Sequence, residues 1–229
     1  MSNVPMALWG ATALYIAVTP LGTTAWAQAS SSAVSAPETS GSRTYTVQAA
    51  QTQLAVLVKY DRNGLIAGHD HVIQSNQPTG TIVWDPKDMS QCQVSISFPA
   101  HSLQVDPGDS RARFGFKGTT SEADKAKIRK NMLGPAQLNA EQFPTISYQA
   151  DTCEQTAGQT IVHGSLTLHG VKKPVQTGLE IAIQDGRFTA KGSFKATHED
   201  FDLRPFAALL GSIRNDTALE FHLNIVATP

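Results

Sequence analysis

Two histidines separated by a single residue are the sharpest local candidate for chemistry in this chain. They lie in the run Gly68-His69-Asp70-His71. On a β-strand, residues two positions apart share a face, so both imidazoles could reach one metal ion or one anion, whereas Asp70 would point away. A turn whose histidines bond nearby backbone groups explains the run equally simply. We therefore carry a metal site at His69 and His71 as a hypothesis.

Motifs of catalysis and of cofactor binding are missing from the sequence. It contains no G-x-S-x-G, no H-E-x-x-H, no phosphate-binding loop, no G-x-G-x-x-G and no haem-attachment C-x-x-C-H. The run His198-Glu199-Asp200 places acid and base groups side by side, but we interpret it as a polar loop. We expect a protein that is not an enzyme and that needs no cofactor.

The chain has two cysteines, Cys92 and Cys153. In an oxidising compartment an even pair favours a disulfide, and two unrelated buried thiols are the alternative. If the strands that follow Cys92 and precede Cys153 pair antiparallel with Phe98 opposite Ser147, the two cysteines face each other. We predict a Cys92–Cys153 disulfide.

Alternation of apolar and polar residues dominates the chain after residue 52. It is clear in 53–61, 81–85, 94–98 and 179–183, and it continues to the last strand candidate at 219–225. Such alternation predicts strands with one buried face. Asp185-Gly186 joins two of them as a tight hairpin. The pattern predicts an all-β fold of about eight to ten strands, either a sandwich or a barrel.

Two segments interrupt this pattern with helical signals. Ser121 stands three residues before Asp124, as in a capping box, and the helix is expected to run to Leu133 before Gly134-Pro135 stops it. The second segment, Pro205–Ile213, starts with proline and has apolar residues at helical spacing. We expect both to pack over one barrel end.

The N-terminus resembles an export signal. An apolar stretch from Met6 ends in Ala25-Trp26-Ala27, the small-x-small pattern before a signal-peptidase cut, although no Lys or Arg occurs before Arg43. A transmembrane anchor is the alternative, but Pro and Gly interrupt the stretch. We predict a signal peptide at 1–27, a disordered linker at 28–44, a folded domain at 45–229, and a periplasmic location.

Four segments along the chain are distinctive when taken together. They are Leu54–Gly68, Leu138–Tyr148 with its Phe143-Pro144-Thr145-Ile146, His163–Val175, and Phe201–Phe206 followed by Asp216–Ile225. In this order they resemble the YceI family of exported, lipocalin-like proteins. The resemblance implies an all-β fold, an antiparallel eight-stranded lipocalin-like barrel with one or two short helices over an end. It also implies that the barrel is periplasmic and encloses a polyisoprenoid or another long apolar chain. One departure from this expectation is that no obvious cationic cluster seats a diphosphate head. The nearest candidates are Arg62, Arg111, Arg113 and Arg204.

We therefore expect an exported lipid-binding protein, and a metal- or haem-associated periplasmic barrel built on the histidine pair is the alternative. The net charge of −1 gives no basic excess for nucleic acid. A long-chain lipid or isoprenoid is the expected partner, and a carrier of this kind allows transient contact with a membrane or a membrane protein. The residues predicted to face a ligand inside the barrel are Leu54, Val56, Val58, Ile82, Trp84, Val94, Ile96, Phe98, Ile146, Tyr148, Leu166, Leu168, Leu179, Ile181, Phe188, Phe194, Phe221 and Leu223.

Overall fold

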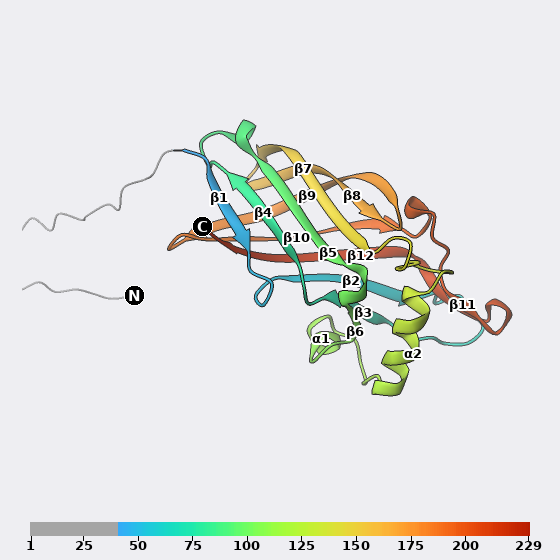
Figure 1. Cartoon of the computed structure of the whole chain (residues 1–229). Helices are drawn as coiled ribbons and strands as arrows, with labels where there is room; N and C mark the ends of the chain where they lie inside the picture. The colour runs from blue at the N-terminus through green and yellow to red at the C-terminus, as the bar shows by residue number, and fades with distance from the viewer. Residues whose placement is uncertain (1–40) are drawn as a thin grey trace, which may run out of the picture. The chain divides into compact units, whose positions relative to one another are not determined.

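The computed structural model describes residues 41–229 (Figure 1). The predicted signal peptide at 1–27 and residues 28–40 of the predicted linker lie outside the described residues. The first strand begins at Arg43, so it takes in the last two residues of the segment predicted as linker.

Strands make up most of the described chain. In order they are β1 (Arg43–Val47), β2 (Gln53–Tyr60), β3 (His71–Ser75), β4 (Thr79–Trp84), β5 (Gln93–Pro99), β6 (Leu103–Val105), β7 (Thr145–Thr156), β8 (Gln159–Leu168), β9 (Val171–Gln184), β10 (Arg187–Thr197), β11 (Ala207–Ala208) and β12 (Ile213–Thr228). The helices are α1 (Ser110–Arg113) and α2 (Glu122–Leu133), with 3-10 turns at Met89–Gln91, Ala100–Ser102, Glu199–Phe201 and Leu209–Gly211.

Eight antiparallel strands close into a barrel, which confirms the predicted fold class. Three of the eight strands are bent, and each of these is labelled as two segments. They are β1 with β2, β3 with β4, and β5 with β6. β1 pairs with β4 on one side and with the C-terminal end of β12 on the other, and β2 continues along β12. This double pairing joins the first strand of the barrel to the last.

Three two-residue turns connect β7 to β10 into a run of hairpins. They are Ala157-Gly158, His169-Gly170 and Asp185-Gly186, and all six residues have positive φ. Turns of this hand match the right-handed twist of the strands that they join. The hairpin predicted at Asp185-Gly186 is therefore confirmed.

A disulfide joins Cys92 to Cys153, as predicted, with the two Cα atoms 5.9 Å apart. The register behind that prediction was wrong by one residue, because β5 and β7 pair Phe98 with Ile146. The register of β7 against β8 shifts around Asp151, so β7 carries one extra residue at that point. The bulge moves the chain forward by one residue and brings Cys153 to the end of β5 where Cys92 lies.

The helix α2 matches its prediction. Ser121 Oγ accepts a hydrogen bond from the Asp124 amide at 3.1 Å, and Gly134 follows the last helical residue. No helix within residues 41–229 is long and apolar enough to cross a membrane.

The second predicted helix, at Pro205–Ile213, was wrong. β11 forms there and pairs with the start of β12, and a tight turn at Leu209–Gly211 connects the two strands. Leu209 and Leu210 have φ of 49° and 56°, which a right-handed helix does not allow. The exposed edge of β12 offers backbone hydrogen bonds to this segment, and these outweigh the helical spacing of its apolar residues.

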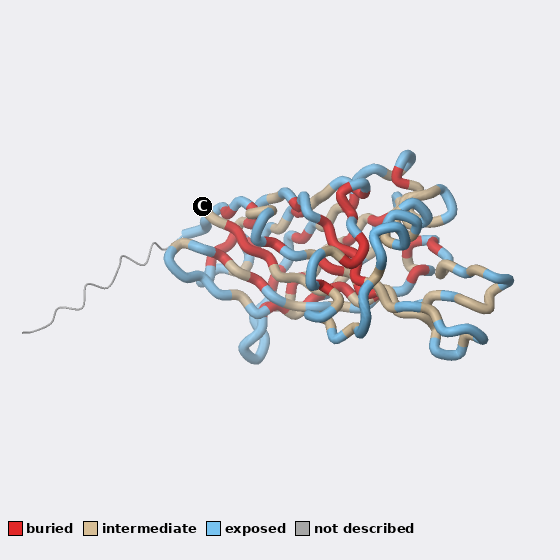
Figure 2. Tube along the Cα trace, turned by 90° about the horizontal axis from the view of Figure 1, so that it is seen from below, coloured by how far each residue is buried: buried red, intermediate tan, exposed pale blue. Residues whose placement is uncertain are grey.

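Buried positions recur along the strands (Figure 2). The buried apolar side chains of the barrel interior form two clusters. The first surrounds Tyr45, Trp84 and Phe188 at the end where β12 and β9 finish, and we call it the closed end. The second cluster surrounds Phe201, Leu219 and Phe221, and α2 packs against it. A third, smaller cluster lies outside the barrel, where Phe114 and Phe116 cover the outer face of β2. This cover explains why β2 is apolar on both faces.

We expect removal of the disulfide to destabilise the barrel without changing its fold. In the chain-entropy model, a crosslink that spans 61 residues is worth about 4 kcal/mol. The double variant Cys92→Ala/Cys153→Ala should lose up to that amount in urea unfolding followed by circular dichroism. Reduction of the unmodified protein should produce the same shift, and a reduced protein as stable as the oxidised one would contradict the prediction.

Candidate functional site

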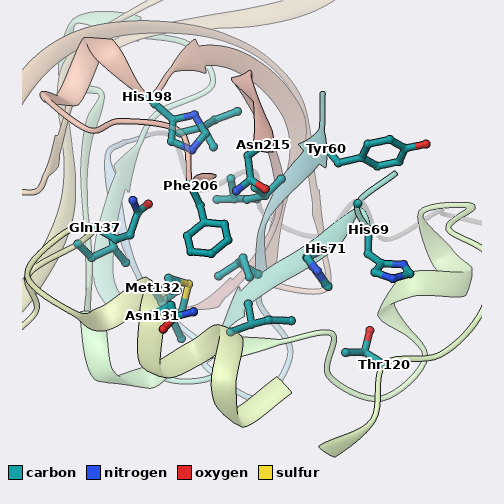
Figure 3. A pocket seen from close by; sticks show the side chains of 18 of the residues that line it. Tyr60, His69, His71, Thr120, Asn131, Met132, Gln137, His198, Phe206 and Asn215 are labelled. Atoms are coloured by element: carbon teal, nitrogen blue, oxygen red, sulfur yellow. The ribbon is translucent and has the colours of Figure 1, made fainter. Parts of the chain in front are cut away.

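A deep cavity occupies the half of the barrel that α2 covers, and its volume is about 660 Å³. This size lies within the range of sites that hold a small molecule or a lipid chain. Strand residues form its inner wall, and α2 contributes Ile128 and Met132 from one face. Phe206 points into the pocket from the segment before β11, across from Met132 (Figure 3).

Part of the predicted ligand-facing set lines this cavity. These residues come from β2, β5, β7, β8 and β12, and they are Val56, Val58, Phe98, Ile146, Leu166, Leu168 and Phe221. They share an inward direction and lie in the half of each strand nearer α2. The wall of the cavity is therefore apolar and continuous across the barrel.

The remaining predicted residues lie elsewhere in the interior. Most of them form or pack against the closed-end cluster: Leu54, Ile82, Trp84, Val94, Ile96, Tyr148, Leu179, Ile181, Phe188 and Leu223. The ring of Phe194 stacks on the ring of Phe221, with their centroids 4.5 Å apart. Large aromatic rings fill the closed end, where Phe188 contacts Tyr45 at 5.3 Å and Trp84 at 6.0 Å between centroids. The cavity therefore stops halfway down the barrel.

Tyr148 lies at the boundary between the two halves. Its ring packs against both interior clusters, and burial raises the pKa of its hydroxyl to about 12. Gly164 on the neighbouring strand leaves the space for this ring, since a Cβ there would lie 2.5 Å from the Tyr148 hydroxyl oxygen. Tyr148 thus connects the two apolar clusters, and Gly164 allows its ring to lie there.

Sequence reasoning missed the cavity residues that come from outside the strands. Leu138, Leu203 and Phe206 reach the cavity from the segments that connect helices and strands. For α2 a signal existed, because Ile128 and Met132 are four residues apart and so share a helix face. The loop residues carry no such periodicity, so only the folded chain brings them together.

Polar and cationic side chains gather at the opening of the cavity, and we call this set the polar rim. Its members are His69, His71, Arg111, Lys117 and Lys127. His69 and both lysines are exposed, and neither lysine has an ion-pair partner among residues 41–229. Of the four arginines considered from sequence, Arg111 lines the cavity, whereas Arg62 pairs with Asp70 and Arg113 with Asp109. Arg204 is exposed beside β11.

A buried carboxylate, Asp106, holds the polar rim in place. It accepts hydrogen bonds from His71 Nδ1 at 2.8 Å, from Thr120 Oγ1 at 2.6 Å and from the Val72 amide at 2.8 Å. Arg111 Nη1 lies 3.3 Å from the same carboxylate. Burial by itself raises the pKa of Asp106, but the hydrogen bonds from His71, Thr120 and Val72 outweigh it and lower the pKa to about 2.

The histidine pair has a local role in this arrangement. An ionised carboxylate can only accept, so His71 carries its proton on Nδ1 and directs it at Asp106. The ring centroids of His69 and His71 are 6.5 Å apart, and residues 41–229 contain no group of three His, Cys, Asp or Glu side chains placed to hold a metal ion. His198 lines the cavity from another side, with its Nδ1 directed at the Thr217 carbonyl and its pKa lowered by burial.

We expect Asp106 to make the barrel sensitive to acid. Its pKa of about 2 lies below the ordinary 3.8, so its stabilisation is complete above pH about 4 and is lost as the pH falls through about 2. At neutral pH, Asp106→Asn should cost about 2 kcal/mol of unfolding free energy or more. The exposed Asp109→Asn serves as a control. Urea unfolding at pH 7 and pH 3 checks this, and an equal loss in both variants would contradict it.

Comparison with known proteins agrees with this geometry. A family model described as the YceI-like domain matches residues 45–225. No match to the chain was found among curated proteins. Among solved structures, BcnA of Burkholderia cenocepacia is 16% identical, with a TM-score of 0.60, and the alignment covers 80% of this chain and 99% of BcnA. A polyisoprenoid-binding domain from Saccharophagus degradans is 12% identical, with a TM-score of 0.55 and coverage of 80% and 97%.

At such identities the solved structures establish likeness of fold. The family model covers most of the chain and spans the barrel from β1 to β12. It includes the motifs around Phe143 and His169, which meet in the structure, since the ring of Phe143 lies edge-on to His169 at 4.8 Å. From this match we conclude that the chain belongs to the YceI-like domain family.

Proposed function

We propose that this protein binds one long apolar chain, an isoprenoid or another lipid, with the chain in the cavity and its head at the polar rim. The observation that carries the proposal is the apolar cavity of about 660 Å³, closed at its inner end and open beside His69, Lys117 and Lys127. A cavity with one opening fixes the direction of the ligand, because its apolar end must enter first.

The energetics favour such a ligand. Each methylene moved from water into an apolar wall gains about 0.8 kcal/mol, so a long chain gains much more than a compact polar molecule could in the same space. The exposed cationic groups that line the cavity are those of the polar rim, and further polar side chains such as Asn131, Gln137 and Asn215 lie at other points around the pocket (Figure 3). We therefore propose a role in binding or carrying rather than in catalysis, and membership of the YceI-like family supports this role. The similar Saccharophagus degradans domain, which is described as polyisoprenoid-binding, adds support at the level of fold.

Two further parts of the proposal concern the location of the protein. The Cys92–Cys153 disulfide favours an oxidising compartment. Together with the export signal expected at 1–27, it supports a periplasmic protein. The direct test is native mass spectrometry of protein purified from a periplasmic extract, followed by solvent extraction. An added mass that matches a lipid or isoprenoid chain is the expected result, whereas a bare mass under gentle conditions would count against the proposal.

Filling the cavity should abolish ligand retention. Val56 on β2 and Leu166 on β8 line the cavity from opposite sides of the barrel. We expect Val56→Trp and Leu166→Trp, singly and together, to lower the bound fraction at least about tenfold, since each indole occupies space that the chain needs. Thr81→Trp on the exposed outer face of β4 is the matched control. Folding is checked by circular dichroism, and full retention in a folded double variant would place the ligand elsewhere.

The two unpaired rim lysines should select the head group. Lys117→Gln and Lys127→Gln remove charge without removing the apolar stems of the side chains. We expect the double variant to bind an isoprenoid phosphate several-fold more weakly and the matching isoprenoid alcohol unchanged. Titration of both ligands into delipidated protein, followed by tryptophan fluorescence or calorimetry, measures the ratio. An equal loss for both ligands would show that the lysines do not contact the head.

A further inference from the structure

Two loops lie side by side at the open end of the barrel. One is the connection from β2 to β3, and the other is the turn from β11 to β12 (Figure 1). The Ile66 amide donates to the Ser212 carbonyl at 3.0 Å, and the Asp61 amide donates to the Arg214 carbonyl at 2.9 Å. Arg214 Nε also reaches Asp61 Oδ2 at 2.6 Å. The two loops therefore form one joined projection.

Large apolar side chains at the end of this projection face solvent. We call Leu65, Ile66, Leu209 and Leu210 the apolar tip; their exposed fractions are 89%, 46%, 64% and 108%. Within residues 41–229, only Ile183 is another large hydrophobic residue with comparable exposure, and it lies at the closed end. Scattered exposed leucines are ordinary, but a cluster of four on adjoining loops marks an interaction surface.

The backbone of the turn makes this exposure costly. Leu209 and Leu210 both have φ in the left-handed region, where glycine or asparagine would be less strained. A turn that only had to connect two strands would not need leucine at these positions. The leucine side chains themselves, held outward, are therefore the feature to be explained.

The apolar tip is continuous with the cavity. Ala67 and Gly68, which follow Ile66, line the cavity opening, and so do Ala208 and Ile213 on either side of the turn. An apolar path thus runs from the tip to the cavity wall. A chain that left an apolar medium at the tip would reach the cavity without crossing water.

Charge is arranged around the tip in a layer. No charged residue occurs between Arg62 and Asp70, or between Arg204 and Arg214, and the three arginines at the base are exposed. The Arg62 guanidinium lies over the ring of Tyr60, 3.8 Å from its centroid. The same layer holds Asp70 and Asp61, which pair with Arg62 and Arg214, so Arg204 is the arginine of the three that no carboxylate within residues 41–229 balances. An apolar tip above such a polar collar matches the order of layers at a bilayer surface, where acyl chains lie beneath phosphates.

We propose that the apolar tip inserts into a phospholipid bilayer, with Arg62, Arg204 and Arg214 at the level of the lipid phosphates and the cavity opening at the membrane surface. This docking stands on the tip alone, whereas its use in loading or unloading a chain rests on the proposed function.

The first test measures partition onto vesicles of phosphatidylethanolamine and phosphatidylglycerol by flotation. In Leu65→Ser/Leu210→Asn, two apolar side chains are lost, and asparagine suits the left-handed backbone at position 210, so the barrel should fold normally. We expect partition to fall at least about tenfold. Ile183→Ser, which removes an exposed apolar side chain at the closed end, should leave partition unchanged. All these proteins share residues 1–40, so the difference between them reports the tip.

The second test locates the contact. The described residues contain no free cysteine, so Leu210→Cys and, as a control, Ile183→Cys can each be labelled with an environment-sensitive dye. On addition of vesicles, the emission at position 210 should shift to the blue and be quenched by brominated acyl chains, and that at position 183 should not change. An unshifted label at 210, or tip-dependent self-association without vesicles, would overturn the proposal.

These outcomes are separable from a failure of the ligand proposal. A tip variant that still retains ligand but no longer floats supports docking independently of the cavity. A Val56→Trp variant that floats normally without ligand would do the same. If cavity variants and the unmodified protein retain no ligand while the tip still inserts, the proposed function fails and the docking stands.

Discussion

The pairing of β1 with both β4 and the end of β12 is the constraint on which the rest of the structure depends. Closure leaves the long strands β7 to β10 paired on both sides, so neighbours satisfy their backbone hydrogen bonds and the inward side chains are shielded from water. Closure also fixes the direction of each side chain, because a slip of one residue would turn a whole strand inside out. The apolar cavity can exist only within such a closed wall.

Within that wall, side-chain size decides which half is solid. Tyr45, Trp84 and Phe188 meet at the closed end and leave no room for a ligand. Nearer α2 the inward residues are mostly aliphatic, and the opposite sides of the barrel do not meet. Tyr148, seated over Gly164, marks the change from one half to the other. The aromatic residues of the closed end therefore confine the site to the other half of the barrel.

The open end depends on a different kind of interaction, a buried charge with several hydrogen-bond donors. Asp106 binds His71 on β3, Thr120 before α2 and Arg111 on α1, so one carboxylate ties the loop that carries the rim to the barrel. Burying a carboxylate is costly unless donors surround it, and here they do. This anchoring holds His71 and Arg111 of the polar rim in fixed positions beside the cavity.

Local periodicity, turn chemistry and simple pairing were enough to predict an all-β fold, the tight hairpin at Asp185-Gly186, the α2 helix and the disulfide partners. The eight-stranded barrel was predicted from the family resemblance. Only the tertiary structure decided which inward residues face space and which face each other, since alternation reports direction and not the distance across the barrel. It also replaced the helix expected at Pro205–Ile213 with a strand and a turn, because the edge of β12 supplied hydrogen bonds that no local pattern reveals. The polar rim could not be predicted as one site either, because its residues come from β3, α1, α2 and two connecting segments, which meet only after the barrel closes.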